Sequence, residues 1–181
     1  MQFIYDQIKA TQAAACLLKR RGGRHDYGSL VKLLYLADRK ALISGGGSIT
    51  GAGPVCMPHG MVLSEVLNSI TKAGEGTYWR QFISSPQGRY VSLLSSPPSP
   101  DHLSRFEHDI LVNIDQEFGT FSFTKLRRYT HKLPEYQDPQ GSSIRIDPEI
   151  ILARAGVKEE YIKEVSAQVA ARRLLYELQR D

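Results

Sequence analysis

Three side chains that could support nucleophilic catalysis lie close together in the sequence: His59, Ser64 and Glu65. A serine becomes a nucleophile when a base lies within hydrogen-bond reach and a third group orients that base. If residues 60–70 form a helix, Ser64 lies about one turn from Gly60 and comes near His59. Such a trio would make a small hydrolase. We favour the alternative that His59 and Ser64 cap and fix the start of the helix, and we expect no enzyme and no catalytic residue.

Two other patterns resemble parts of ligand sites. Cys56 and His59 have the spacing of half a zinc site, but Cys16 stands alone and the remaining histidines form no second pair at ligand spacing. The glycines between residues 45 and 53 could cradle a phosphate, but no Gly-Lys-Ser or Gly-Lys-Thr follows them. A tight turn between two helices explains these glycines better. We therefore expect no metal and no cofactor.

Helical periodicity predicts most of the elements that must position these residues. A helix capped by Asp26 or Ser29 and ended by the glycines from Gly45 has a broad apolar stripe, so we expect it to lie nearly buried at the centre of the fold. Further helices are predicted over residues 3–20, from Val62 to Ile70, over 100–118 with Ser99 as its cap, from Ser122 to His131, from Asp147 to Gly156, and over 157–180. The residues expected to face the core are Ile4, Ile8, Ala15 and Leu18 in the helix over 3–20. In the helix over 100–118 they are Leu103, Phe106, Ile110, Ile114 and Phe118, and in the helix over 157–180 they are Tyr161, Val165, Val169 and Leu175.

One region has the character of strands. Residues 77–83 and 89–94 are β-prone runs separated by Pro86-Gln87-Gly88, which predicts a hairpin. Residues 48–60 are rich in glycine and proline without a clear period, so we expect an ordered loop there. The predicted fold class is mainly α, a single compact helical domain over residues 1–181 with a small β-hairpin or short antiparallel sheet.

Composition excludes several classes of protein. With 181 residues, 41% of them hydrophobic and 23% charged, the chain resembles an average globular domain rather than a disordered segment. Its apolar runs are too short to cross a bilayer, and no charged segment followed by an apolar stretch begins the chain, so we expect a cytoplasmic protein. Two cysteines suit a reducing compartment. The net charge of +4 is mild, and its two clusters, residues 19–24 and 125–128, are solvated helix ends more often than a DNA-binding surface, so nucleic acid is not expected as a partner.

A set of short motifs, in order, resembles a known family. The motifs are Lys32-Leu33-Leu34-Tyr35-Leu36-Ala37-Asp38-Arg39, Ile49-Thr50-Gly51, Met57-Pro58-His59-Gly60, Val62-Leu63-Ser64 and Leu126-x-x-Tyr129-Thr130-His131. Together they look like the Panacea antitoxin domain, also called the SocA-like antitoxin domain, over about residues 5–135. Residues 147–181 would then be a C-terminal helical extension. Two positions depart from the family pattern: Met61 stands where proline usually follows His-Gly, and Tyr136 stands near a position often held by tryptophan.

The resemblance implies a function in binding. Members of the family are bacterial and phage proteins that neutralise toxins encoded beside them by direct contact, and the SocA-type member delivers its toxin to a Clp protease. The expected partner is therefore a cognate protein toxin, with a Clp-type protease as a second partner if the chain is an adaptor. Residues expected to contact the partner or to define the module are Lys32, Tyr35, Asp38, Arg39, His59, Ser64, Glu65, Trp79 and His131. Alternatives from other classes are the Ser/His hydrolase and autoregulatory binding to DNA.

Overall fold

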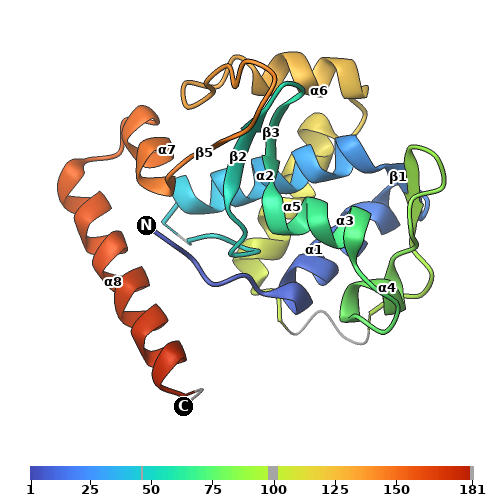
Figure 1. The fold of residues 1–181 in the computed structure, drawn as a ribbon, viewed down its shortest axis with the longest axis horizontal. Helices are drawn as coiled ribbons and strands as arrows, with labels where there is room; N and C mark the ends of the chain where they lie inside the picture. The colour runs from blue at the N-terminus through green and yellow to red at the C-terminus, as the bar shows by residue number, and fades with distance from the viewer. Residues whose placement is uncertain (46, 98–101, 180–181) are drawn as a thin grey trace.

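A single helix, α2 (Tyr27–Ile43), crosses the middle of the computed structural model, which describes residues 1–45, 47–97 and 102–179 (Figure 1). Twelve of its 17 residues are buried. The helix contacts α5 (Arg105–Phe118) and a strand hairpin most extensively, and it also touches α1 (Gln7–Arg20). The prediction of a buried central helix is confirmed. Its position means that polar side chains on α2 must find partners inside the protein.

Local capping explains where several helices begin and end. The Asp26 carboxylate accepts a hydrogen bond from the Ser29 amide at 2.7 Å, so Asp26 rather than Ser29 is the cap of α2. Ser122 caps α6 (Phe123–Thr130), and Asp147 followed by Pro148 opens α7 (Pro148–Arg154), as predicted. Gly156, with φ of +80°, follows the end of α7.

The helices predicted over residues 3–20 and 100–118 begin later than predicted. The first helix begins at Gln7 after the Asp6 cap, so Ile4 precedes it, and both Ile4 and Ile8 are only half-buried. The helix predicted over 100–118 is α5, which begins at Arg105 because Ser104 and Glu107 form a capping box there. The predicted cap at Ser99 lies outside the described residues. Phe106 is exposed, whereas the other predicted inward residues of α5 are buried, and Gly119 ends the helix as expected.

The loop predicted over residues 48–60 is correct for residues 48–53, but a three-stranded sheet begins at Pro54. Strands β2 (Pro54–Met57), β3 (Gly60–Leu63) and β5 (Ile144–Arg145) form an antiparallel sheet in the order β3-β2-β5. Val62 pairs with Val55 in the hairpin instead of beginning a helix, and α3 (Ser64–Lys72) starts only after the strand. All four residues of β3 are buried. A short strand buried on both faces shows no alternation, so its sequence does not differ from that of a buried helical turn.

The predicted hairpin over residues 77–94 is half correct. The first run forms a short helix, α4 (Tyr78–Phe82), because Thr77 caps it and Arg80 donates hydrogen bonds to the carbonyls of Ile70, Ala73 and Ser84. The second run contains β4 (Tyr90–Ser92), whose partner is β1 (Arg24–Asp26) rather than the first run. An isolated bridge between Ile83 and Leu93 still holds the two runs side by side.

The last helix, α8 (Glu159–Leu178), runs along one side of the molecule and its C-terminal end points away from the body (Figure 1). Ile162 and Val169 are its buried residues. Val169 is buried and Val165 half-buried as predicted, but Tyr161 and Leu175 are exposed, so the predicted inward face is half correct. The architecture is mainly α with a small antiparallel sheet, as predicted. Among the described residues, no helix combines the length and the apolar character that crossing a membrane requires.

Candidate functional site

Tyr35 and Arg39, one turn apart on α2, share a buried carboxylate that the sequence motifs did not indicate. Arg39 donates to Glu135 from Nε to Oε1 at 2.6 Å and from Nη2 to Oε2 at 3.2 Å. The Tyr35 hydroxyl donates to the same Oε1 at 2.6 Å. Glu135 is fully buried. This network ties α2 to the segment after α6, and Glu135 was missed because nothing in its neighbourhood marks it as a partner of residues about 100 positions earlier.

Asp38 organises the turn that follows α2. Its Oδ1 accepts the amides of Ile49 and Thr50 at 3.0 and 3.1 Å, and its Oδ2 accepts the hydroxyls of Ser48 and Thr50 at 2.7 and 2.6 Å. Burial raises the pKa of Asp38 to about 6, although the four donors favour its charged form. Asp38 and Arg39 therefore do not pair with each other. Each fixes a different segment of backbone.

Glu65 and Ser64 fix the other end of the hairpin. The Glu65 Oε2 atom accepts hydrogen bonds from the Gly53 amide and from the Ser64 hydroxyl, both at 2.7 Å. Ser64 Oγ also lies 3.1 Å from the Gly53 carbonyl oxygen. These contacts close the chain around the start of α3, so Ser64 and Glu65 act on the backbone in this structure.

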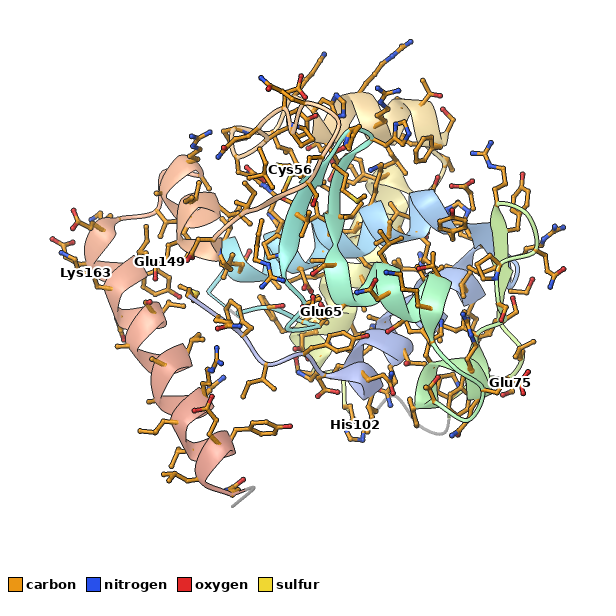
Figure 2. All side chains as sticks on the ribbon, viewed as in Figure 1. Cys56, Glu65, Glu75, His102, Glu149 and Lys163 are labelled. Atoms are coloured by element: carbon orange, nitrogen blue, oxygen red, sulfur yellow. The ribbon has the colours of Figure 1, made fainter. Side chains whose placement is uncertain are left out.

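The hydrolase trio is not assembled. His59 lies in the exposed turn between β2 and β3, whereas Ser64 follows the far end of β3. Along an extended strand, the five residue steps from His59 to Ser64 span roughly 16 Å, well beyond hydrogen-bond reach. Figure 2 shows Cys56 near the turn of the hairpin and Glu65 near its opposite end. The premise that residues 60–70 are helical was wrong, since residues 60–63 form a strand.

Cys56 and His59 are not joined by further metal ligands in the part of the chain that the structure describes. Cys56 is buried, with its Sγ 3.1 Å from Met61 Sδ, and accepts the Gln137 amide at 3.4 Å. His59 is exposed, and its ring and that of Phe123 form a T-shaped pair with centroids 6.1 Å apart. Within the described ranges, no three His, Cys, Asp or Glu side chains are grouped so that they could hold a metal ion.

His131, Gly60 and Lys32 meet where the hairpin turn reaches α6. His131 stacks on Tyr136 with ring centroids 4.4 Å apart, and its buried Nε2 has no hydrogen-bond partner among the described residues. Burial lowers the pKa of His131. Lys32 is 1% exposed, and its Nζ lies 3.4 Å from the Met61 carbonyl oxygen. Trp79 lies elsewhere, fully buried in α4, so it packs in the core and is not available to a partner.

Gly60 permits this junction, and we expect Gly60→Ala to lower stability by about 1–3 kcal/mol, the range for a strained residue. Its φ is +100°, and an added Cβ would lie 2.2 Å from Thr130 Oγ1 and 3.2 Å from Lys32 Nζ. Gly88→Ala is the matched control, because its φ of +61° carries a similar backbone cost while an added Cβ meets nothing within 4 Å. Urea unfolding of both variants measures the difference. Equal losses would show that the contact with Thr130 is unimportant.

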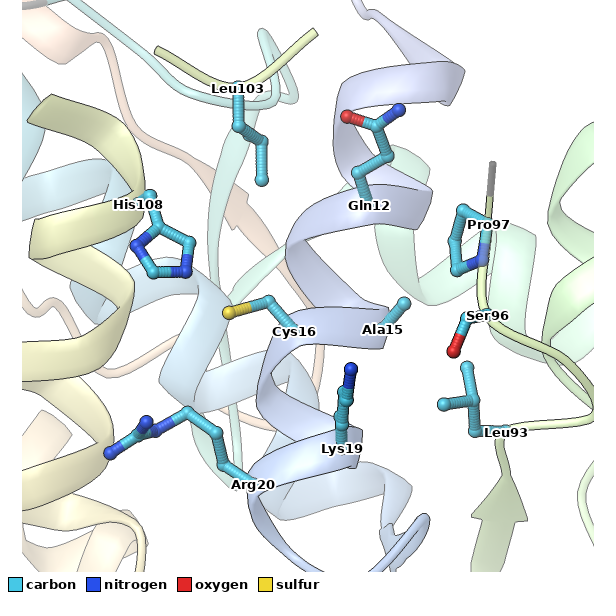
Figure 3. A pocket seen from close by; sticks show the side chains of 10 residues that line it. All are labelled: Gln12, Ala15, Cys16, Lys19, Arg20, Leu93, Ser96, Pro97, Leu103 and His108. Atoms are coloured by element: carbon cyan, nitrogen blue, oxygen red, sulfur yellow. The ribbon is translucent and has the colours of Figure 1, made fainter. Parts of the chain in front are cut away.

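A separate hollow of about 410 Å³ lies between α1, α5 and the segment after β4 (Figure 3). Figure 3 shows Cys16 of α1 extending toward His108 of α5. The basic residues near it are partly neutralised, since Arg20 and Arg21 both donate to the buried Asp115, at 2.8 and 2.5 Å. Two of the four basic residues of the first cluster are thus held in ion pairs, whereas Lys19 and Arg24 are exposed.

Comparison with known families decides the relationship of this chain. Residues 30–137 match the family described as antitoxin SocA-like, Panacea domain. The chain belongs to this family. The match begins within α2 and ends just beyond Tyr136, so it contains all of the predicted site residues and the buried Glu135. No curated protein and no solved structure matched the chain.

Membership in the SocA-like family gives the three polar networks a common context. They join α2 to the Glu135 side chain, α2 to residues 48–50, and α3 to the Gly53 amide, all within the matched range. The motif residues Tyr35, Asp38, Arg39, Ser64 and Glu65 therefore maintain the shape of the domain. Lys32 and His59 take no part in these three networks, and both line a pocket beside the hairpin turn.

Proposed function

We propose that this protein is an antitoxin that neutralises a cognate protein toxin by binding it directly. The observation that carries the proposal is the match to the SocA-like, Panacea family over residues 30–137. The geometry agrees with a binding module, because most polar motif residues fix the scaffold and the Ser64 and His59 pair that a hydrolase needs is not formed. A rigid scaffold favours tight binding, since less entropy is lost when the partner docks.

We further propose that residues 147–181 act as an extension that contributes to the choice of toxin. The C-terminal half of α8 carries Leu174, Leu175 and Leu178, which are 58%, 60% and 64% exposed. Single exposed leucines are ordinary, but three within two turns of one helix form a patch of the kind found at protein interfaces. This helix lies outside the matched range, where sequence can change without altering the shared core.

Co-expression with the protein encoded by the neighbouring gene tests the proposal. If that protein arrests growth, we expect this chain to restore growth and to co-elute with it from a sizing column. Replacing Leu174, Leu175 and Leu178 together by serine should weaken binding to the toxin at least about tenfold, as expected for loss of an interface anchor. The control replaces Gln168 and Arg172, which are exposed on the same helix, by serine, and it should bind the toxin normally.

Two outcomes would contradict direct neutralisation by binding. Restored growth with the toxin disappearing from the lysate, and its return when Clp-type proteases are deleted, would identify an adaptor instead. Failure to restore growth with any toxic neighbour would reject the antitoxin role, and enzymatic and DNA-binding functions would then need testing.

A further inference from the structure

A second hollow of about 410 Å³ opens beside the hairpin turn and contains the most deeply buried lysine of the described chain. Its walls come from the start of α2, from the hairpin, from α3 and from α6. The apolar lining consists of Tyr27, Val31, Met57, Pro58, Val62, Leu67 and Phe123. Lys32 lines the same hollow, while His59 and Arg89 line it from more exposed positions. The hollow is thus an apolar pocket with an ammonium group at its inner side.

Among the residues that the structure describes, no carboxylate forms an ion pair with the Lys32 ammonium. Its contacts are the Met61 carbonyl oxygen at 3.4 Å and the face of the Phe123 ring, whose centroid is 5.6 Å away. An ammonium group has three donors, so two have no protein acceptor among the described residues. Buried lysines normally have a partner, because burial of an unpaired charge is costly. Burial, with a smaller contribution from Arg127, lowers the pKa of Lys32 to about 8, while the charge of Asp26 acts in the opposite direction.

The acidic residue that lines this pocket is already engaged. Asp26 accepts the Ser29 amide at 2.7 Å as the cap of α2, and it accepts Arg89 Nε at 2.5 Å. The other charged groups around the pocket are basic: Arg89 on its wall and Arg127 on α6, while His59 and His131 add imidazole rings. The pocket therefore has an unsatisfied positive charge within apolar walls.

We infer that this pocket receives a carboxylate side chain of the toxin, which pairs with the Lys32 ammonium while the aliphatic part of that residue and its apolar neighbours contact the walls. The inference rests on the proposed antitoxin function and names the chemistry of one contact within it. A carboxylate fits better than a phosphate, because one ammonium matches one negative charge and the walls match an aliphatic stem. Lys32 and most of the pocket lining lie inside the family match, and no lining residue comes from α8.

Lys32→Met tests the role of the charge, because methionine keeps much of the length of lysine without its ammonium group. We expect the midpoint of thermal unfolding to stay equal or rise, since an unpaired buried charge is removed, while the toxin dissociation constant rises at least about tenfold. Lys40→Met, at an exposed position on the same helix, should leave the dissociation constant unchanged. A Lys32→Met protein that binds toxin as tightly as the unmodified protein would overturn the inference.

A small-molecule probe tests the pocket without the toxin. In the full chain with ¹³C-labelled lysine, hexanoate should shift the Lys32 ε-methylene NMR signal in a saturable way, and 1-hexanol should not. Inorganic phosphate that shifts the signal as strongly as hexanoate would overturn the assignment to a carboxylate with an aliphatic stem, and so would the absence of any shift with hexanoate. This probe also serves if Lys32→Met does not fold.

The two experiments separate failure of the inference from failure of the proposed function. If the toxin binds but Lys32→Met has no effect, the pocket inference fails and the antitoxin function stands. If hexanoate binds at Lys32 and no neighbouring toxin is neutralised, the pocket remains a carboxylate site and the antitoxin function fails.

Discussion

Replacing Glu135 by alanine should lower the free energy of unfolding by about 3–5 kcal/mol, the range for removal of one partner from a buried ion pair. The carboxylate is fully buried and receives three hydrogen bonds, two from Arg39 and one from Tyr35. Without it, the guanidinium of Arg39 stays largely buried and unpaired, and the segment after α6 loses its attachment to α2. Urea unfolding followed by circular dichroism measures the loss.

Tyr35→Phe is the matched control for this network. It removes a single hydrogen bond to Glu135 and leaves the ion pair with Arg39 in place, so we expect a loss of about 1 kcal/mol. If the two variants lost equal stability, the cost would come from the hydroxyl contact and not from the stranded charge of Arg39.

Replacing Asp38 by alanine should cost about 2–4 kcal/mol at pH 7, because it leaves buried donors without acceptors. The amides of Ile49 and Thr50 and the hydroxyls of Ser48 and Thr50 all depend on this one side chain. Thr50→Val is the control, since it removes one hydroxyl and should cost about 1 kcal/mol. Hydrogen exchange at the Ile49 and Thr50 amides should rise in the Asp38→Ala protein, and unchanged exchange would contradict the role of Asp38 in holding the turn.

The same variant has a defined pH dependence. Burial raises the pKa of Asp38 from 3.8 to about 6, so between these values the folded state holds a proton that the unfolded state has released. The contribution of Asp38 to stability is therefore fully present below about pH 4 and declines as pH rises through 6. The difference in unfolding free energy between the unmodified protein and Asp38→Ala should be larger at pH 4.5 than at pH 7. A difference that grows with pH would show that the carboxylate is stabilised as the anion instead.

The sequence by itself determined features that depend on neighbouring residues. Asp26, Ser122 and Asp147 start helices because a capping side chain bonds to an amide two or three positions later. The broad apolar stripe of α2 fixed its central position, since a helix that is apolar on most sides must be surrounded. The ordered motifs from Lys32 to His131 were sufficient to indicate the SocA-like family, which the match over residues 30–137 confirms.

Tertiary structure decided the features that depend on distant residues. The hairpin of β2 and β3 packs on α2, and the run from Tyr78 became helical because its arginine found carbonyl acceptors on neighbouring segments. The inward face of α8 was predicted correctly at Val165 and Val169 but not at Tyr161 and Leu175, because only part of that helix meets the body of the protein. Glu135 joins Tyr35 and Arg39 across about 100 residues, and β3 separates His59 from Ser64. Caps act within one turn of a helix, whereas strand pairing and the burial of charge depend on which distant segments meet, and that is settled only when the whole core packs.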